Sequence, residues 1–147
     1  MSSKKMYPFV ASCAAGLERL VSHEIAGFKG TQIEEMVGGV TWSGEIESAY
    51  RACLWSRFAS RVLLTIDTFT ISDADDLYNG CAKIEWTNFL DEEMTFSVSS
   101  TFGADPVLSH SHYSSLRVKD AVVDFFRGLG RDRPNVAKEK PDIHIHL

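Results

Sequence analysis

Val37-Gly-Gly-Val-Thr-Trp-Ser-Gly44 lies at the centre of the first predicted unit of this chain. A Gly-Gly pair between two runs of strand-forming residues predicts a tight hairpin turn, so residues 31–37 and 40–42 are expected to form antiparallel strands. On either side, the apolar run at residues 9–13 predicts an earlier strand and residues 61–67 predict a later one. The hairpin therefore belongs to a four-stranded arrangement.

Two helices are predicted in the intervals between these strands, because apolar residues recur at i, i+3 and i+4. The first helix begins after Gly16 and ends before Gly30. Its apolar face consists of Leu17, Leu20, Val21 and Ile25. The second begins after Ser43, its expected N-cap. Its apolar face consists of Ile46, Ala49, Tyr50, Cys53 and Leu54. The order β-α-β-β-α-β is the ferredoxin-like pattern.

A second unit, of α/β type, is predicted over residues 71–147. Its expected elements are, in order, a helix capped by residues 71–76, a strand at 92–99, a basic helix at 114–127, a loop at 128–141 and a strand at 142–147. Two strands cannot cover two helices well, and the sequence stops on an apolar residue directly after a strand. We therefore expect an α+β fold with domains at 1–70 and 71–147, the second truncated at its C-terminus.

The composition, with 44% hydrophobic and 24% charged residues, indicates an ordinary folded protein. No apolar run approaches the roughly 18 residues that a membrane span needs, so no membrane partner is expected. The three cysteines are far apart and odd in number: Cys13, Cys53 and Cys81. We interpret them as reduced core residues of a cytoplasmic protein. The tryptophans are also predicted to be core residues: Trp42, Trp55 and Trp86.

Charge is distributed unevenly along the chain, whose net charge is −5. Residues 1–101 carry 8 Lys+Arg against 14 Asp+Glu, and residues 102–147 carry 7 against 6. Between His110 and Lys140 the count is 7 against 4, a net charge of +3. This distribution argues against a protein that binds nucleic acid over its whole surface. It indicates a local basic patch, which is what phosphate contacts require.

Six short blocks carry a resemblance to a known family. They are Val37–Gly44, Leu54-Trp-Ser-Arg-Phe-Ala-Ser-Arg-Val62, Ala74-Asp-Asp-Leu-Tyr78, Tyr113-Ser-Ser-Leu-Arg-Val-Lys-Asp-Ala-Val-Val-Asp124, Arg133-Pro-Asn135 and Pro141-Asp-Ile143. In order and without large gaps, they closely resemble the N-terminal part of the bacterial large-subunit ribosomal RNA guanine-N2 methyltransferases. The resemblance implies a ferredoxin-like domain joined to a THUMP domain, which is an RNA-binding module. A methyltransferase domain that uses S-adenosylmethionine would follow in cis, and many members carry a second one that acts on guanine N7.

The resemblance implies RNA binding by this chain and catalysis elsewhere. The expected partner is 23S ribosomal RNA, as a stem-loop of naked or precursor RNA from which one guanine is presented for methylation. S-adenosylmethionine would serve the parent enzyme, and no cofactor is expected in this chain. The residues of this chain are consistent with the absence of a cofactor site. A glycine-rich cofactor loop opens a helix, whereas the only Gly-x-Gly, Gly128-Leu-Gly130, closes a predicted one. No catalytic or cofactor-binding residue is predicted.

The basic helix and the loop after it supply the predicted RNA contacts, because loops on a rigid scaffold often carry function. The predicted RNA-binding residues are Arg117, Lys119, Arg131, Arg133, Asn135, Lys138 and Lys140. An alternative stays open for both segments. Asp120, Asp124 and Arg127 are typical of ordinary solvated helix charges, and acidic residues at 132 and 139 also interrupt the loop.

Other features have different interpretations. His144-x-His146 together with His110-x-His112 raises a zinc hypothesis, but no cysteine or carboxylate stands at a known ligand spacing, so no metal is predicted. Arg57 and Arg61 are expected to pair with the acids of residues 72–76 and to join the two units. The alternative function is a protein–protein interaction module without RNA affinity, which suits the acidic first 101 residues. An independent small enzyme lacks a nucleophile–base pair or a carboxylate dyad.

Overall fold

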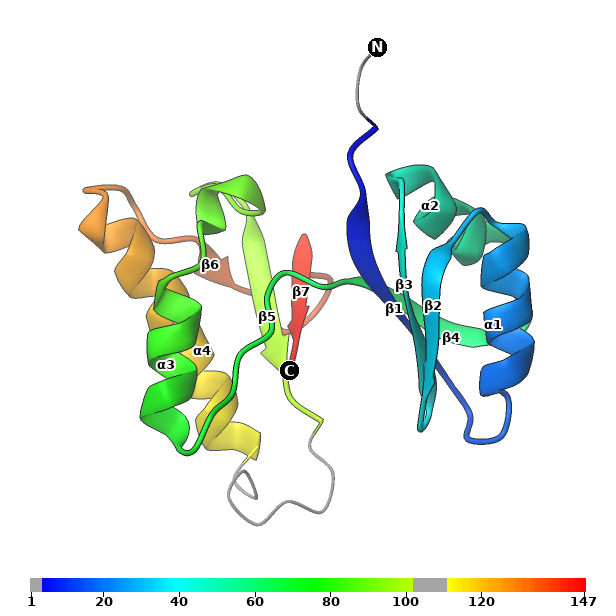
Figure 1. The fold of residues 1–147 in the computed structure, drawn as a ribbon. Helices are drawn as coiled ribbons and strands as arrows, with labels where there is room; N and C mark the ends of the chain where they lie inside the picture. Colours follow the sequence, from blue (N-terminus) through cyan, green and yellow to red (C-terminus); the bar gives the residue numbers. More distant parts are fainter. Residues whose placement is uncertain (1–3, 102–110) are drawn as a thin grey trace. The chain divides into compact units, whose positions relative to one another are not determined.

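The computed structural model describes residues 4–101 and 111–147, which form two compact units, Met1–Thr68 and Phe69–Leu147 (Figure 1). The elements of the first unit are β1 (Tyr7–Cys13), α1 (Glu18–Gly27), β2 (Thr31–Met36), β3 (Gly39–Gly44), α2 (Ile46–Trp55) and β4 (Ala59–Leu64). The predicted β-α-β-β-α-β order is confirmed. The strands form an antiparallel sheet in the order β2-β3-β1-β4.

The core of the first unit lies between this sheet and its two helices. The buried strand residues are Phe9, Ala11, Val40 and Trp42, and the buried helix residues are Val21, Ile25, Ala49 and Ala52. Register aligns Phe9 with Trp42 across β1 and β3, and their ring centroids are 5.3 Å apart. The Trp42 indole N–H donates to Ser48 Oγ at 3.1 Å, and Ser48 Oγ donates to the Glu45 carbonyl at 2.8 Å.

The predicted hairpin between β2 and β3 is confirmed, and its glycines are required by geometry. Gly38 has φ = +77°, a left-handed value, and a Cβ on Gly39 would lie 2.8 Å from the Ala11 carbonyl oxygen. The Glu18 carboxylate accepts from the backbone N–H of Gly38 at 2.9 Å and of Gly16 at 2.7 Å. The bond from Gly38 is the main cause of a pKa of Glu18 below its usual range, and the bond from Gly16 lowers this pKa further.

Of the predicted apolar face of α2, only Ala49 is buried. The other buried residues of the helix, Ser48 and Ala52, lie outside that face. Ile46, Tyr50 and Leu54 are 44%, 61% and 73% exposed. The bulky Trp42 ring occupies the space beneath the helix and bonds to Ser48, so a face of small side chains packs there. The helix also begins one residue after Glu45 and not at a cap formed by Ser43, and it shows no side-chain cap bond.

Two further expectations are corrected in the first unit. Trp55 is 58% exposed and Cys53 is exposed, because both lie on α2 outside its buried face. Arg57 lies beside Glu24 of its own unit, with 3.8 Å between Nε and Oε1. The Glu24 carboxylate also accepts from Ser56 Oγ at 2.6 Å, so it fixes the approach to β4.

The described residues of the second unit contain one strand more than the sequence pattern predicts. Its elements are α3 (Ala74–Ala82), the 3-10 turn η1 (Trp86–Asn88), β5 (Thr95–Ser99), α4 (Ser111–Gly128), β6 (Asn135–Val136) and β7 (Ile143–His146). The strands form a parallel sheet in the order β6-β5-β7, and α3 lies alongside α4 (Figure 1). At two residues, β6 is too short to show a period, which is why residues 128–141 were expected to be a loop.

The core of the second unit joins α3, α4 and the sheet. Its buried residues are Leu77, Cys81, Trp86, Leu90, Phe96, Val118, Ala121, Val122, Phe126 and Ile145. The Trp86 indole N–H donates to the Cys81 carbonyl at 2.9 Å, which satisfies a polar group inside this core. The capping segment predicted at residues 71–76 is confirmed, and the cap within it is Asp73, whose Oδ1 accepts from the backbone N–H groups of Asp75 and Asp76 at 2.9 and 2.8 Å.

Candidate nucleic-acid interface

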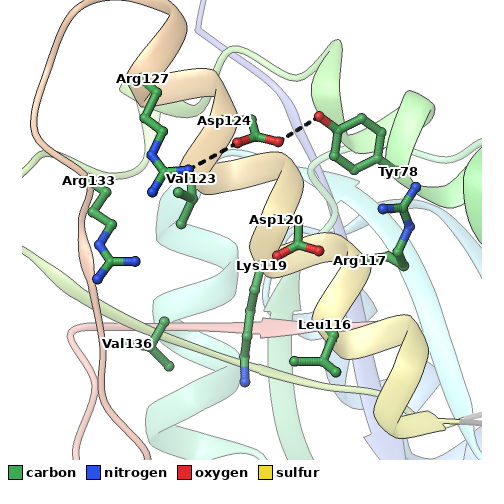
Figure 2. Close-up of a pocket in the computed structure, with 10 residues that line it drawn as sticks. All are labelled: Tyr78, Leu116, Arg117, Lys119, Asp120, Val123, Asp124, Arg127, Arg133 and Val136. Carbon is green, nitrogen blue, oxygen red and sulfur yellow. Dashed lines mark hydrogen bonds and ion pairs between the residues drawn. The ribbon is translucent and has the colours of Figure 1, made fainter.

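An open groove of about 480 Å³ runs along α4 in the second unit (Figure 2). It is lined by α4, by Tyr78 of α3 and by the segment that leads into β6. Its charged lining residues are Arg117, Lys119, Asp120, Asp124, Arg127 and Arg133. Four cations against two carboxylates give the groove a positive balance.

One side of the groove is occupied by a network that joins α3 to α4. An Arg117 Nη2–Asp75 Oδ1 ion pair of 2.6 Å links the two helices, and the guanidinium lies 4.6 Å from the centre of the Tyr78 ring. The Tyr78 hydroxyl donates to Asp124 Oδ2 at 2.8 Å, a bond that raises the pKa of Tyr78. Arg127 Nη1 lies 3.6 Å from Asp124 Oδ1. These charges are engaged within the protein.

Within the part of the chain that the structure describes, Lys119 and Arg133 lack the carboxylate partners that Arg117 and Arg127 have. Among residues 4–101 and 111–147, no carboxylate lies within ion-pair distance of either cation. Lys119 extends from α4, and Arg133 extends from the segment before β6, so two elements place unpaired positive charge on one groove (Figure 2). The apolar side chains of Leu116 and Val136 line the same groove and are 40% and 48% exposed.

The end of α4 explains how Arg133 reaches this groove. Gly130 has φ = +69°, and its N–H donates to the Arg127 carbonyl at 2.9 Å. The Arg131 N–H donates to the Phe126 carbonyl at 3.1 Å. This pair of bonds is a Schellman motif, so the predicted helix end is confirmed. The motif reverses the chain, and the buried Pro134 then precedes β6, whose Asn135 pairs with Thr95 of β5.

The remaining predicted contact residues lie outside the groove lining. Arg131, Lys138 and Lys140 are exposed in the segments before and after β6, and Asn135 is exposed within it. No pattern in the sequence predicts a site role for Tyr78, Leu116 or Val136. Tyr78 is 46 residues from Asp124, to which it bonds, so only the packing of α3 on α4 reveals its place.

The histidine pair of β7 is organised by a serine. The His144 and His146 rings stack with centroids 4.1 Å apart. Ser99 Oγ lies 3.0 Å from His144 Nε2 and 2.9 Å from His146 Nδ1. His110 lies outside the described residues, as does the side chain of His112, so the four-histidine hypothesis falls partly on undescribed positions. Within the described part of the chain, no three potential metal ligands come together.

None of the helices in the described residues is both long and apolar enough to cross a membrane. The architecture is that of a two-domain α+β module whose second domain carries a basic groove. Residues 8–63 match the family model described as the RlmL ferredoxin-like domain. Residues 71–147 match the THUMP domain model, and the chain belongs to the THUMP domain family.

Similar proteins extend this assignment. The chain is 42% identical over 144 residues to the Ribosomal RNA large subunit methyltransferase K/L of Desulfotalea psychrophila, an alignment that covers 98% of this chain and 20% of that protein. The chain thus spans about a fifth of this relative's length. A possible methylase from Clostridium difficile 630 has the same fold, with a TM-score of 0.83 at 23% identity over 97% of this chain and 39% of that one. SMU.472, a putative methyltransferase complexed with SAH, also has this fold, with a TM-score of 0.80 at 24% identity. That alignment covers 98% of this chain and 38% of the SMU.472 chain.

Proposed function

We propose that this chain is the RNA-binding module of a larger 23S ribosomal RNA guanine-N2 methyltransferase that uses S-adenosylmethionine. The domains would be 1–70 and 71–147, and the site of action would be the cytoplasm. The proposal is supported by the THUMP family membership and by the name of the similar large-subunit methyltransferases. The structural observation that carries it is the groove beside α4 with its two cations, Lys119 and Arg133, for which the described residues supply no carboxylate partner.

Phosphate contact follows from the electrostatics of that groove. The binding free energy of a phosphate contact is most favourable when the protein cation has no carboxylate partner. Such a contact releases condensed counterions from the RNA and breaks no ion pair within the protein. Lys119 and Arg133 meet that condition, and the guanidinium of Arg133 is also suited to bidentate phosphate binding. We assign backbone contacts on a stem-loop to these two residues, with Arg131, Asn135, Lys138 and Lys140 extending the contact along the exposed segments beside β6. Arg117 is assigned a positioning role, since Asp75 and Tyr78 already engage it.

Catalysis is assigned to a part of the parent outside residues 1–147. A solved structure of similar fold was obtained with SAH, which supports S-adenosylmethionine as the cofactor of the parent. The residues of this chain do not fit that group. A glycine-rich cofactor loop opens a helix and uses its N-terminal N–H groups, whereas Gly128 and Gly130 close α4. The chain alone is therefore proposed to be non-catalytic.

The test measures binding of 23S ribosomal RNA stem-loops by fluorescence anisotropy over a range of salt concentrations. Lys119→Ala and Arg133→Ala should each weaken binding to every stem-loop and lower the salt slope by about 0.7–0.9. Arg51→Ala is the charge-matched control, because Arg51 is paired with Glu47 in the other unit. Wild-type affinity and slope in both groove variants would refute the assignment of the groove. Absence of RNA affinity in the wild-type chain and its parent would favour the protein-interaction module instead.

A further inference from the structure

The α2 helix of the first unit has apolar residues on two faces. The face packed on the sheet is made of small residues, Ser48, Ala49 and Ala52. The opposite face carries larger ones at positions 46, 50, 53 and 54. We call Ile46, Tyr50, Cys53 and Leu54 the outer stripe. Three of them are 44%, 61% and 73% exposed, in the order Ile46, Tyr50, Leu54, and Cys53 is exposed as well.

This arrangement is unusual for a surface helix, whose outer face is normally polar. Single exposed apolar residues need no explanation. The outer stripe is different because its members recur at i, i+4, i+7 and i+8, the spacing of a helix face that packs against another surface. The first unit already has a complete core without the stripe. The stripe therefore has the pattern of a contact surface and lies outside the core of its own unit.

We propose that the outer stripe is the surface on which the rest of the parent protein, outside residues 1–147, docks onto this module. The proposal rests on the proposed function, in which the chain is part of a longer enzyme. Its support is the length of polypeptide available, since the chain spans only 20% of the Desulfotalea relative that it matches over nearly all of its own length. The occupant is therefore an apolar surface in the same polypeptide.

The size of the stripe favours this occupant over a second copy of the chain. α2 has 10 residues, which makes it about 15 Å long. A contact of that length does not reach the roughly 1,000 Å² that a stable complex between separate molecules buries. Docking within one polypeptide is less demanding, because a tether gives an effective concentration in the millimolar range and avoids most of the entropic cost of association.

Cys53 provides a reporter inside the stripe. The experiment compares the rate of iodoacetamide alkylation of Cys53, followed by peptide mass spectrometry, in residues 1–147 and in the full-length parent. The buried Cys81 serves as an internal control for folding in both. Since thiol reactivity depends on access, Cys53 should react about tenfold or more slowly in the parent. Equal rates in the two proteins would overturn the proposal. Protection in residues 1–147 that grows with protein concentration would point to a second copy and overturn it too.

A matched pair of variants separates docking from folding. Leu54→Lys places a charge on the stripe, and Val37→Lys places one at the turn after β2, where Val37 is 94% exposed. Neither should change the unfolding midpoint of residues 1–147. In the parent, only Leu54→Lys should return Cys53 to the alkylation rate seen in the isolated chain. Protection that survives Leu54→Lys, or that is lost equally in Val37→Lys, would contradict the docking surface.

Failure of this proposal can be told apart from failure of the proposed function. RNA affinity and its dependence on Lys119 and Arg133 are measured on the same parent. A parent that methylates and binds RNA while Cys53 stays reactive refutes the docking surface alone. A parent without RNA affinity in which Cys53 is protected refutes the RNA assignment and leaves the docking surface standing.

Discussion

The guanidinium of Arg117 on α4 lies 4.6 Å from the centre of the Tyr78 ring on α3. The same guanidinium pairs with Asp75 Oδ1 at 2.6 Å, and the Arg117 side chain is only 24% exposed. Arg117 thus contacts two residues of the neighbouring helix. This relationship separates it from Lys119, its neighbour two positions along the same helix, although the sequence presents both simply as cations.

The first prediction concerns that separation. Arg117→Ala should lower the free energy of unfolding by about 1–2 kcal/mol, because it removes a cation–π contact and an exposed ion pair that together join α3 to α4. It should leave the salt slope of RNA binding unchanged, whereas Lys119→Ala should lower the slope and leave stability unchanged. Urea denaturation and anisotropy titrations on both variants provide the comparison. A lower salt slope in Arg117→Ala would show that Arg117 contacts RNA directly.

Local chemistry explains what the sequence could predict. The hairpin required Gly38 at φ = +77°, and the α3 cap required the Asp73 carboxylate. The end of α4 required Gly130. Each of these requirements involves only a few consecutive residues. Each therefore restricts the residue type at one position, and that residue type can be read from the sequence. The order of elements in the first unit follows from such local signals.

The features that the sequence could not predict depend on contacts between distant segments. α2 has apolar residues on two faces, and periodicity alone cannot show which face meets the sheet. That choice depends on Trp42, whose indole bonds to Ser48. The same limit applies to the site, where Tyr78 meets Asp124 only because α3 packs on α4. The strand β6 was missed because its two residues pair with β5 through a register that only the fold supplies.

The choice of α2 face leads to a second prediction. Ser48→Ala should destabilise the first unit by about 1–3 kcal/mol, because the buried Trp42 indole N–H would lose its acceptor. Ser60→Ala, at an exposed position of β4, is the control and should have little effect. Combining Ser48→Ala with Trp42→Phe tests the cause, since the serine variant should cost less once no indole N–H is present. Strict additivity in this double-mutant cycle, measured by urea denaturation, would exclude the bond as the source.

The two glycines at the end of α4 support a third prediction, because they have opposite backbone requirements. Gly130 has φ = +69°, whereas Gly128 is helical, and a Cβ would meet no atom within 4 Å at either. Gly130→Ala should destabilise the protein by about 1 kcal/mol, the cost of a left-handed residue that carries a Cβ. Gly128→Ala should stabilise it by about 0.5–1 kcal/mol by reducing the entropy of the unfolded chain. Thermal unfolding of the two variants is the measurement, and shifts of the same sign would contradict the Schellman end.

A fourth prediction concerns acid stability and the carboxylate that joins β5 to β7. Asp142 Oδ2 accepts from the Thr95 backbone N–H and from the Thr95 hydroxyl, both at 2.8 Å. The backbone bond first and the hydroxyl second hold the pKa of Asp142 below its usual value. Since the folded protein binds the proton more weakly than the unfolded chain, the carboxylate stabilises the fold fully above the ordinary aspartate pKa of about 3.9. That contribution is lost as pH falls through the lower, folded value.

Asp142→Asn keeps the shape of the side chain and removes its charge, so it isolates this contribution. The difference in unfolding midpoint between wild type and Asp142→Asn should be constant from neutral pH down to about pH 5 and should shrink as the pH falls further. Asp120→Asn, on the exposed side of α4, is the control and should not reproduce this profile. A difference that stays constant to about pH 2, or one that grows on acidification, would contradict the assignment, because a carboxylate with a lowered pKa can lose its stabilising effect only on the acid side.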